Sequence, residues 1–590
     1  MGKIINAMYL FHILLVISNI ILRMRKISNV IVVLLVIISA FVSSVVNAQV
    51  VDNSLYKKEL EKVELKLREG KFEDGLVLLD QIALDYPNEQ DVYYAKALIY
   101  SQLGNYDGAL ENAQKAYSLN SNMFYANYLM ELYKSKKRYS DGIALVKDLQ
   151  TKGNNGEGLN RELLLLYAEN GDLNVAKQLY SDLIKSNHSD TLNLVMAEIL
   201  MSVNERESAK NILIGLQDNS NLPDVYGYLS YIYLQDSKLK DAISVVNRGL
   251  SKTGNKTLYM DLAEVYKKQG KSDLMIGALK NAFNADEAHF EDKFRFLTKL
   301  IYEEGSSVDS KLMSLADILV LKHPDLLEAQ ALRGDLFWKL GNIADARSIF
   351  LKIVSSNPNH INAWRQVINA DLALNQPDEG IKHAMQALKF NPNNSQLLYF
   401  ASLAYASKKD YEASKNLLET ALNFSENENN YVKSMIYGSL GDIYHELKLE
   451  DISDVAYQEA IDLDSLNVGA MNNFAYYLAN RKKDLHIAAK YSALTNTLEP
   501  NTATFMDTYA WVLFQQGNYQ EALHWIEKAV KINTTSSVLL EHYGDILSKL
   551  GKTNEAVKYW GKSIDLIKNG NTEASIDKIQ SKIKEKKYVE

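Results

Sequence analysis

The stretch ATFMDTYAWVLFQQGNYQEALHWIEKAVKINTTS, residues 503–536, decides the fold. Apolar and small residues recur in it at helical spacing on both sides of a glycine: Met506, Tyr509, Ala510 and Leu513 before it, then Ala522, Ile526 and Ala529 after it. The glycine, Gly517, stands where the first helix must end, because the left-handed conformation favoured there costs glycine little. The stretch therefore predicts two helices joined by a tight turn.

Two small residues indicate how these helices meet. Ala510 and Ala522 are expected at the crossing point, where only small side chains let two helices approach closely. A bulky side chain at either position would force the helices apart, at a cost of roughly 1–3 kcal/mol. Phe505 and Trp525 are accordingly interpreted as packing residues and not as a catalytic or binding box.

The same pattern returns with a regular period along the chain. Separate residue types share a spacing of 34 residues: Gly70 to Gly104, Gly517 to Gly551, Ala522 to Ala556, and Pro324 to Pro358 to Pro392. Independent residue types that share one period are typical of a repeat array.

The composition agrees with helices and excludes several chemistries. The 590 residues include only 7 prolines and 28 glycines, and both residue types break helices. Cysteine is absent, which excludes disulfides, thiolate zinc sites and cysteine nucleophiles. The hydrophobic content of 47% is enough for a core, and it excludes a chain that is disordered throughout.

The units resemble tetratricopeptide repeats, which carry a small residue at position 8, glycine at position 15 and alanine at positions 20 and 27. The segments EAQALRGDLFWKLGNIADARSIFLKIVSSNPNH (328–360) and VYYAKALIYSQLGNYDGALENAQKAYSLN (92–120) fit this frame. About fifteen units, some of them degenerate, run from Tyr56 to Gly570. The resemblance implies an all-α fold, a right-handed superhelical α-solenoid of about fifteen antiparallel helix pairs.

Breaks in the repeat register predict the domain boundaries. A longer, irregular unit at residues 291–326 separates an N-terminal array at 56–290 from a C-terminal array at 327–570. The polar tail at 571–590 is expected to form a helix that caps the last apolar face of the array.

The first 48 residues differ from the rest, because they contain four basic residues and no acidic one. A basic start at Met24, an apolar run, and the small residues Val46 and Ala48 predict a signal peptide cleaved before Gln49. In this interpretation the residues before Met24 belong to an over-extended gene start. The alternative is an uncleaved anchor, since Ile27–Val46 is about long enough to span a bilayer.

The negative net charge of the chain is unfavourable for binding nucleic acid. Removal of the four basic residues of the leader takes the formal charge from −8 to about −12. A protein that binds nucleic acid usually presents a basic face to the phosphates. The sequence therefore predicts no nucleic-acid binding.

No motif predicts catalysis. Three GK[ST] triplets, at 270–272, 551–553 and 561–563, lack the glycine that a phosphate-binding loop needs five residues earlier. A G-x-S-x-G nucleophile turn is absent. His524 and His542 fall on different units and are expected on helix surfaces. The sequence predicts no catalytic residue, no metal site and no cofactor, and hence a protein that is not an enzyme.

The resemblance also implies where a partner binds. In tetratricopeptide arrays the first helices of the units line a concave groove, through positions near 2, 5, 9, 12 and 13. Carried over position by position, the candidate residues are Asp335 and Trp338; Arg365 and Asn369; Asn472, Asn473 and Tyr476; and Asp507, Trp511, Phe514 and Gln515. Aromatic rings beside amides suit an extended peptide, because stacking supplies affinity and amides hold the peptide backbone.

Two alternatives stay open for these candidates. Trp511 and Trp338 can instead pack against a neighbouring unit. Arg365 and Asn369 resemble the start of the carboxylate clamp of chaperone-adaptor repeats, but Phe400 stands where that clamp needs an asparagine. The sequence therefore does not predict recognition of a C-terminal carboxylate.

The leading hypothesis is an exported, non-enzymatic α-solenoid of the bacterial cell envelope, such as the periplasm, that binds protein or peptide partners in its groove. The rival hypothesis is a membrane-anchored scaffold that keeps residues 27–46 and organises a bilayer complex. A binder of glycans or cell-wall polymer is a third hypothesis, supported only by the groove tyrosines. Partner identity and oligomeric state do not follow from the sequence.

Overall fold

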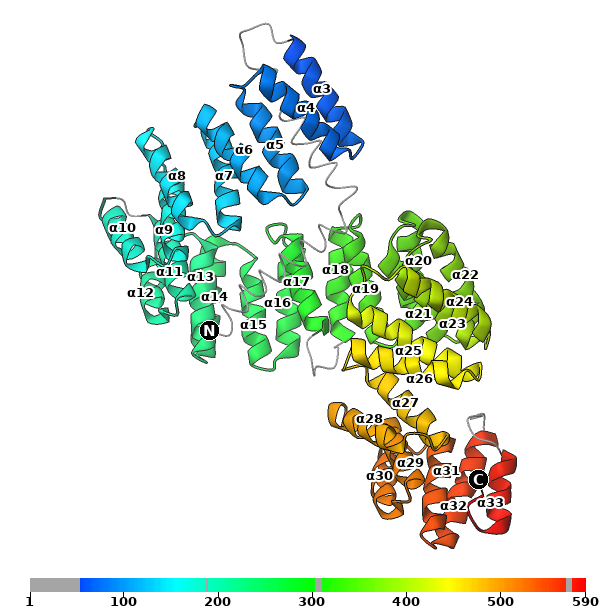
Figure 1. Cartoon of the computed structure of the whole chain (residues 1–590). Helices are drawn as coiled ribbons and strands as arrows, with labels where there is room; N and C mark the ends of the chain where they lie inside the picture. The colour runs from blue at the N-terminus through cyan, green and yellow to red at the C-terminus, as the bar shows by residue number, and fades with distance from the viewer. Residues whose placement is uncertain (1–53, 187–188, 303–309, 569–575, 590) are drawn as a thin grey trace. The chain divides into compact units, whose positions relative to one another are not determined.

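The computed structural model describes residues 54–186, 189–302, 310–568 and 576–589. Every regular element in these ranges is helical: 31 α-helices, α3 to α33, and one short 3-10 helix, η1 (Figure 1). The predicted signal peptide or anchor at residues 1–48 lies outside the described residues.

The helices form pairs in chain order. The first seven pairs are α3 (Ser54–Arg68) and α4 (Phe72–Asp85); α5 (Gln90–Gln102) and α6 (Tyr106–Leu119); α7 (Met123–Ser135) and α8 (Tyr139–Thr151); α9 (Glu157–Glu169) and α10 (Leu173–Ser186); α11 (Asp190–Ser202) and α12 (Arg206–Leu216); α13 (Pro223–Gln235) and α14 (Leu239–Thr253); and α15 (Leu258–Lys268) and α16 (Ser272–Asn284).

Eight further pairs follow, and a single helix ends the array. They are α17 (Phe290–Tyr302) and α18 (Met313–Lys322), with η1 (Ser310–Leu312) between them; α19 (Leu327–Lys339) and α20 (Ile343–Ser356); α21 (Ile361–Ala373) and α22 (Pro377–Phe390); α23 (Ser395–Ser407) and α24 (Tyr411–Asn423); α25 (Asn430–Glu446) and α26 (Glu450–Leu463); α27 (Val468–Asn480) and α28 (Leu485–Leu498); α29 (Ala503–Gln515) and α30 (Tyr519–Ile532); α31 (Ser537–Lys549) and α32 (Thr553–Lys568); and lastly α33 (Ile576–Glu585).

The contacts repeat from pair to pair. The two helices of every pair pack on each other, and within each compact unit of the chain the second helix also packs on the first helix of the next pair. This arrangement, counted from α3/α4 to α31/α32, gives fifteen pairs. The expectation of an all-α solenoid of about fifteen helix pairs is confirmed.

The chain divides into two compact units. The first unit ends at Ala288 and the second begins at His289. Each unit contains its own clusters of buried apolar residues, which continue from one pair to the next within the unit. The finer boundaries expected at 291, 327 and 571 stay predictions.

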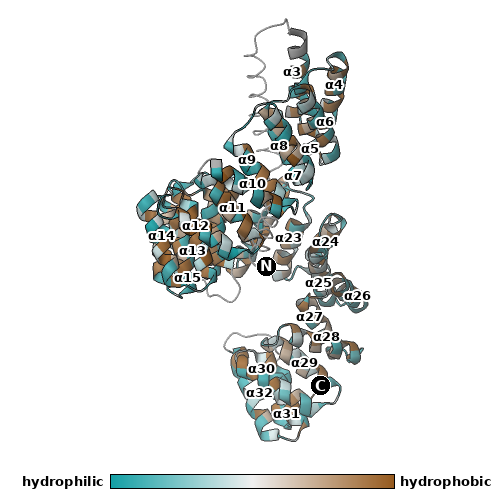
Figure 2. Cartoon of the chain, turned by 90° about the vertical axis from the view of Figure 1, so that its left-hand side faces the viewer, coloured by the Kyte–Doolittle hydropathy of each residue, from teal (hydrophilic) through white to brown (hydrophobic). Residues whose placement is uncertain are grey.

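Small residues at the helix crossings let the paired helices approach. Ala510 and Ala522 are completely buried, as expected. Three pairs have glycine at position 8 and an aromatic residue sixteen positions later: Gly334 with Phe350, Gly441 with Tyr457, and Gly544 with Trp560. A Cβ atom on Gly441 would lie only 2.7 Å from the Tyr457 ring, so the large ring fits because the glycine has no side chain. Apolar residues (brown) and polar residues (teal) alternate along the helices in Figure 2.

In every pair whose turn the structure describes, position 15 holds a left-handed residue, but not always a glycine. Gly517 and Gly551 have φ angles of 83° and 76°. The corresponding residues in other pairs are not glycine: Lys137, Asn204, Ser237, Asn375, Lys409, Lys448 and Lys482, all with φ between 52° and 65°. The turn geometry is therefore retained where the sequence pattern is weak.

Within the described ranges, no helix combines the length and the apolar character needed to cross a bilayer. The last helix, α33, packs on α32 and buries Ile579 and Lys582. Those contacts cover the end of the last pair.

Candidate partner-binding face

The eleven predicted residues all lie on first helices of the second unit. Asp335 and Trp338 are on α19, Arg365 and Asn369 on α21, Asn472, Asn473 and Tyr476 on α27, and Asp507, Trp511, Phe514 and Gln515 on α29. First helices of successive pairs contact one another, as α21 contacts α23 and α29 contacts α31. The surface that the first helices form within one unit is called the inner face below.

Several carboxylates on the inner face accept hydrogen bonds from the next pair. Asp335, at position 9, accepts from Gln366 Nε2 at 3.2 Å, and Gln366 stands at position 6 of the following pair. Tyr302 of the preceding pair donates to the same carboxylate at 2.9 Å. Burial raises the pKa of Asp335, although both donors favour its charged form. Asp335 therefore joins three pairs, whether or not a partner contacts it.

The same arrangement recurs between the twelfth and thirteenth pairs. Asn473, at position 6 of α27, donates to Asp442 Oδ1 on α25 at 2.9 Å, and Tyr457 of α26 donates to the same oxygen. Burial is the main cause of the raised pKa of Asp442. In the first unit, Tyr228 donates to Glu198 at 2.9 Å in the matching positions. Position 6 is thus a contact between pairs in both units.

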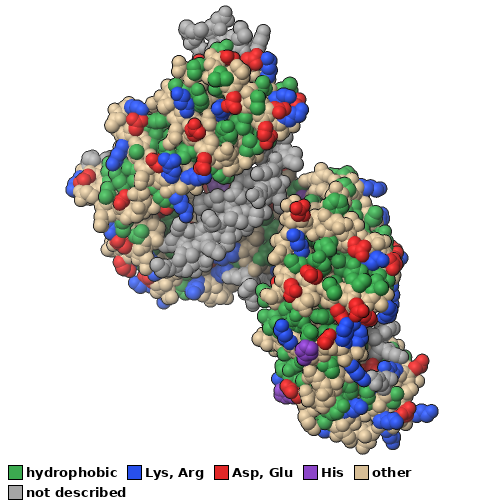
Figure 3. Space-filling view, viewed as in Figure 1, with side chains coloured by type: hydrophobic (Ala, Val, Ile, Leu, Met, Phe, Trp, Pro, Cys, Tyr) green, Lys and Arg blue, Asp and Glu red, His purple; other side chains and the backbone are tan. Residues whose placement is uncertain are grey.

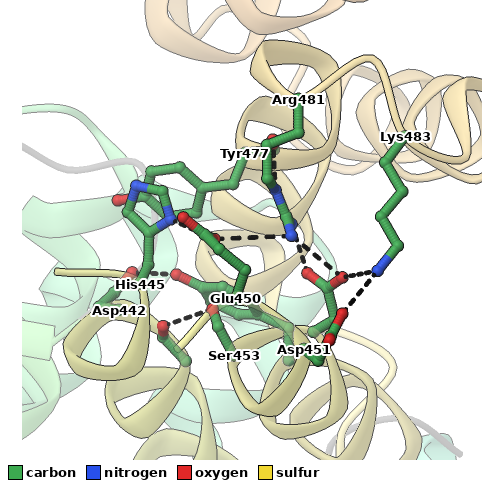
Figure 4. Close-up of polar contacts among 11 residues, drawn as sticks. Asp442, His445, Glu450, Asp451, Ser453, Tyr477, Arg481 and Lys483 are labelled. Carbon is green, nitrogen blue, oxygen red and sulfur yellow. Dashed lines mark hydrogen bonds and ion pairs between the residues drawn. The ribbon is translucent and has the colours of Figure 1, made fainter. Parts of the chain in front are cut away.

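A charged cluster lies beside this contact and also joins the twelfth and thirteenth pairs (Figure 4). The His445 ring stacks on Tyr477 with 3.6 Å between centroids, and its Nδ1 lies 2.9 Å from Glu450 Oε2. Arg481 lies 3.5 Å from the same Glu450 oxygen and also pairs with Asp454. Since these charges are paired within the chain, the cluster fixes one pair on the next.

Arg365 has a donor that the chain leaves unpaired. One terminal nitrogen of its guanidinium donates to Gln396 Oε1 at 3.1 Å and lies 3.2 Å from Asn362 Oδ1. The guanidinium lies over the Phe400 ring, 5.2 Å from its centroid. The Nε atom is buried and has no hydrogen-bond partner. Burial lowers the pKa of Arg365, because desolvation disfavours the cation.

Asn472 likewise has a hydrogen-bond acceptor that the chain leaves unpaired. Its side chain is buried, and its Nδ2 lies 3.3 Å from Asn473 Oδ1. Its Oδ1 is buried without a hydrogen-bond partner. Arg365 and Asn472 both stand at position 5, in the tenth and thirteenth pairs. An unpaired buried polar atom costs roughly 1–3 kcal/mol, so each is a place where a partner could contribute binding energy.

Trp511 and Phe514 are buried between neighbouring residues of the chain. Trp511 is 7% exposed, and its ring stacks on Phe514 at 4.8 Å and on His542 at 4.1 Å. Its indole nitrogen donates to Asn480 Oδ1 at 2.7 Å. Trp511 thus packs against the thirteenth and fifteenth pairs, as the alternative interpretation of this residue predicts. Its role in partner binding stays a prediction.

The remaining candidates are more accessible. Trp338 is half-buried and packs against the apolar core formed by α20 to α26. Asn369, Tyr476 and Gln515 are half-buried on the same inner face.

The expectation that His542 lies on a helix surface is wrong. The side chain is buried, and its Nδ1 lies 2.9 Å from Asp507 Oδ1. Burial opposes a charge on the imidazole, but the carboxylates of Asp507, Asp545 and Glu541 together outweigh this effect and raise the pKa of His542. His542 stands at position 6, which faces the preceding first helix. The repeat frame contains that information, because Asn473 and Gln366 stand at the same position.

A buried lysine lies where no sequence motif indicates one. Lys582 of α33 is 1% exposed, and its Nζ lies 2.6 Å from both Glu541 Oε1 and Asp545 Oδ2 on α31. Trp560 Nε1 donates to the other oxygen of Asp545 at 2.9 Å. Burial still raises the pKa of Asp545 to about 6, although Lys582 opposes that shift. These contacts fasten α33 to positions 5 and 9 of the last pair.

The inner face of the first unit combines tyrosines with acids. The Tyr94 ring lies 5.0 to 5.6 Å from the rings of Phe124, Tyr125 and Tyr128. Further along, burial raises the pKa of Asp261 to about 7, and the carboxylates of Asp224 and Glu264 add to the shift. A pocket of about 650 Å³ opens between α5 and α6, lined by Tyr93, Lys96, Tyr100, Glu111, Asn112, Gln114, Lys115 and Ser118.

No group of three or more histidine, aspartate or glutamate side chains is placed to hold a metal ion in the described part of the chain. The polar contacts described above join helix pairs to one another. They do not assemble a nucleophile with a general base.

Comparisons with known proteins agree with the repeat architecture. One tetratricopeptide repeat family model matches residues 330–568, and a second matches residues 90–123. The TPR repeat-containing protein MJ1428 of Methanocaldococcus jannaschii is 20% identical over 439 residues, which make up 64% of this chain and 75% of that protein.

Other similarities are partial. The protein O-mannosyl-transferase TMTC3 of Homo sapiens is 22% identical over 163 residues, 28% of this chain and only 18% of the human protein. The APC/C hetero-tetramer Cut9–Hcn1 is similar at 14% identity and a TM-score of 0.39, over 84% of this chain and 96% of that chain. YrrB, a TPR protein with an unusual peptide-binding site, is similar at 22% identity and a TM-score of 0.26, over 32% of this chain and 95% of that chain.

The two family models match segments in both units, and the same helix pair recurs fifteen times between α3 and α32. Residues 90–123 and 330–568 therefore match tetratricopeptide repeat families, and the chain is similar, over 64% of its length, to an archaeal protein that contains such repeats.

Proposed function

We propose that this chain is a non-enzymatic scaffold that binds an extended segment of a partner protein along the inner face of its second unit. Tetratricopeptide repeat folds are typical of protein–protein interaction scaffolds, and the chain has that fold. The choice of this face is carried by one observation: position 5 holds an unpaired donor on Arg365 and an unpaired acceptor on Asn472.

The two atoms match what a peptide backbone offers. An extended chain exposes C=O acceptors and N–H donors in alternation, because it makes no hydrogen bonds within itself. Arg365 Nε–H can donate to a peptide carbonyl, and Asn472 Oδ1 can accept from a peptide N–H. Because both atoms are buried in the free chain, the Arg365 and Asn472 side chains must turn toward the peptide before either hydrogen bond forms. Binding would then satisfy a donor and an acceptor that lack partners within the chain.

The surroundings support a peptide over a nucleic acid. Asn369, Tyr476 and Gln515 are half-buried on the same inner face and add amide and phenol groups. Acidic and basic side chains are interspersed on the side of the molecule visible in Figure 3. The formal net charge of −8 is also unfavourable for binding phosphates.

A peptide-library selection on the full chain tests this proposal, followed by affinity measurements with the selected peptide. We expect Arg365→Ala and Asn472→Ala each to weaken binding about tenfold, which corresponds to one hydrogen bond with a buried group. Lys382→Ala is the matched control, because Lys382 is an exposed residue on the second helix α22. Circular dichroism monitors the fold of each variant. Unchanged affinity in both inner-face variants would remove the proposed site.

We also propose that the chain is exported to the cell envelope of a bacterium. The support is the sequence of residues 24–48, with its basic start, its apolar run and the small residues before Gln49. Mass spectrometry of the N-terminal peptide in fractionated cells decides the matter. A chain that starts at Gln49 in the soluble envelope fraction agrees with export. A membrane-bound chain that retains Met24 favours the anchored scaffold instead.

A further inference from the structure

Residues 586–589, the last that the structure describes, lie on the inner face of the last two pairs. After α33 the chain turns at Lys586, which has a φ of 53°, and Tyr588 comes to lie against α29 and α31. The Tyr588 backbone N–H donates to Ser548 Oγ at 2.9 Å. A side chain of the inner face thus holds the backbone of an irregular segment, as it would hold a bound peptide.

The Tyr588 ring contacts one aromatic ring and two cations, those of Phe514, Lys549 and Lys582, and these side chains together are called the pocket below. The Phe514 ring contacts it edge-on, with 5.2 Å between centroids and 72° between planes. The ammonium groups of Lys549 and Lys582 lie 4.8 and 5.3 Å from its centroid. A cation over the face of an aromatic ring is attracted by the ring quadrupole, so these walls favour an aromatic side chain over an aliphatic one.

The pocket residues stand at the positions that the repeat frame assigns to partner binding. Phe514 and Ser548 occupy position 12 of the fourteenth and fifteenth pairs, and Lys549 occupies position 13. α33 itself acts like the first helix of a further pair, because Lys582 reaches Asp545 much as Asn473 reaches Asp442. The residues described after α33 do not continue as a second helix but run along the inner face.

We propose that Phe514, Ser548 and Lys549 form a binding site for an aromatic side chain of an extended peptide, and that Tyr588 is its resident, displaceable ligand. This inference rests on the proposed function, because it assumes that the inner face binds peptides. It adds the class of residue that the face selects at this end of the array, and a way in which the chain competes with its partner.

The tail is held at its two ends with different strength. α33 buries Ile579 and the doubly paired Lys582, whereas Tyr588 and Val589 remain half-exposed. The helix therefore keeps Tyr588 close to the pocket while the tyrosine itself can leave. A ligand tethered by a short connection has an effective concentration in the millimolar range, so a free peptide competes poorly with it until it is removed.

The test uses the full chain and a fluorescent peptide of residues 584–590, KEKKYVE, as the probe. We expect Tyr588→Ala to bind this peptide at least about tenfold more tightly than the unchanged chain, because the tethered competitor is gone. A control peptide with alanine in place of the tyrosine should bind neither protein. Adding Lys549→Ala to the Tyr588→Ala chain should weaken peptide binding again, and the exposed position of Lys549 leaves the fold intact.

The outcomes distinguish failure of this inference from failure of the proposed function. If Tyr588→Ala retains its melting curve but binds the peptide no better than the unchanged chain, the pocket is no peptide site and Tyr588 only packs there. If library peptides bind through Arg365 while the tail peptide binds no variant, this inference fails and the proposed function stands. If the tail peptide binds Tyr588→Ala but Arg365→Ala and Asn472→Ala change nothing, the pocket stands and the site at position 5 fails.

Discussion

Asp545 and Asp261 are both carboxylates of first helices, one in each unit, and they differ in what surrounds them. Asp545 contacts the ammonium of Lys582 at 2.6 Å, whereas Asp261 has the carboxylates of Asp224 and Glu264 as its charged neighbours. Burial raises the pKa of both, to about 6 for Asp545 and to about 7 for Asp261. Even a directly contacting lysine therefore does not recover the full cost of desolvation.

Asp442 is an intermediate case, because its donors are neutral. Tyr457 and Asn473 donate to it, and burial still raises its pKa. The three sites show that an inner face of this chain can hold a buried or half-buried acid with a cation, with neutral donors, or beside like charges. In the first two cases, hydrogen bonds or ion pairs to the acid join neighbouring helices.

The largest expected effect comes from turning the Asp545 site into one like that of Asp261. Lys582→Ala leaves Glu541 and Asp545 on α31 without their cation, and removal of one partner of a buried ion pair costs about 3–5 kcal/mol. We expect urea unfolding followed by tryptophan fluorescence to show this loss, since all 5 tryptophans lie in the second unit. Lys584→Ala, at an exposed position of the same helix, is the control. Equal midpoints for the two variants would contradict the prediction.

The reverse experiment removes the uncompensated charge of the first unit. Because the folded pKa of Asp261 is raised to about 7, above its usual value of 3.8, the stability it contributes is full below pH 4 and is lost as the pH rises through 7. Asp261→Asn should therefore stabilise the first unit by about 1–3 kcal/mol at pH 8 and by almost nothing at pH 4.

Two spectroscopic probes separate the units in this experiment. The stabilisation should appear in the far-ultraviolet circular dichroism transition and leave the tryptophan transition unchanged, since the first unit contains no tryptophan. Asp241→Asn, at an exposed position of α14, is the matched control and should shift stability by less than about 0.5 kcal/mol. A destabilised Asp261→Asn chain at pH 8 would show that the carboxylate has a cationic partner.

A pH titration sharpens the comparison at the end of the second unit. The raised pKa of His542 means that its pairing with Asp507 stabilises the fold below pH 6.5 and that this stability is lost as the pH rises through the folded pKa. Asp545 acts in the same direction near pH 6. We expect Asp507→Asn to remove about 1–2 kcal/mol at pH 5.5, the contribution of a hydrogen bond to a charged group, and less at pH 9. A loss of stability that does not depend on pH would show that His542 stays neutral.

The smallest expected effect concerns the neutral donors. Asn473→Ala removes one of two side-chain donors to Asp442 and should cost about 1 kcal/mol in the tryptophan-detected transition. Asn369→Ala is the comparison variant, because Asn369 is half-buried on a first helix of the same unit. If the two variants unfold at the same urea concentration, the contact between the twelfth and thirteenth pairs contributes nothing measurable.

The sequence predicted the architecture because the repeat leaves its period in several residue types at once. Ala510 and Ala522 lie buried where the pattern placed them. The period says less about the inner face, where one position can face either the next pair or a partner. For that reason the sequence predicts His542 on a helix surface although it is buried, and the role of buried Trp511 in partner binding stays a prediction.

Contacts outside the period could not be predicted at all. Lys582 contacts Glu541 and Asp545, which precede it in the sequence by 41 and 37 residues. A repeat period of 34 residues does not predict either separation. The Tyr588 contact with Phe514 depends on how the tail turns after α33, and no local pattern fixes that turn. By contrast, the sixteen-residue spacing from Gly441 to Tyr457 and from Gly544 to Trp560 is visible in the sequence once its cause is known.

The left-handed turns have a consequence for how this protein tolerates heat and mutation. Seven of them carry a side chain: Lys137, Asn204, Ser237, Asn375, Lys409, Lys448 and Lys482. The left-handed conformation costs such a residue roughly 1–2 kcal/mol, and glycine avoids that cost in return for a smaller loss of chain entropy. Glycine at these sites would add thermal tolerance in increments, nearly independently, because each turn is separated from the next by a whole helix pair. Substitution of these turn residues by glycine can therefore raise the stability of the array without changing a residue of either inner face.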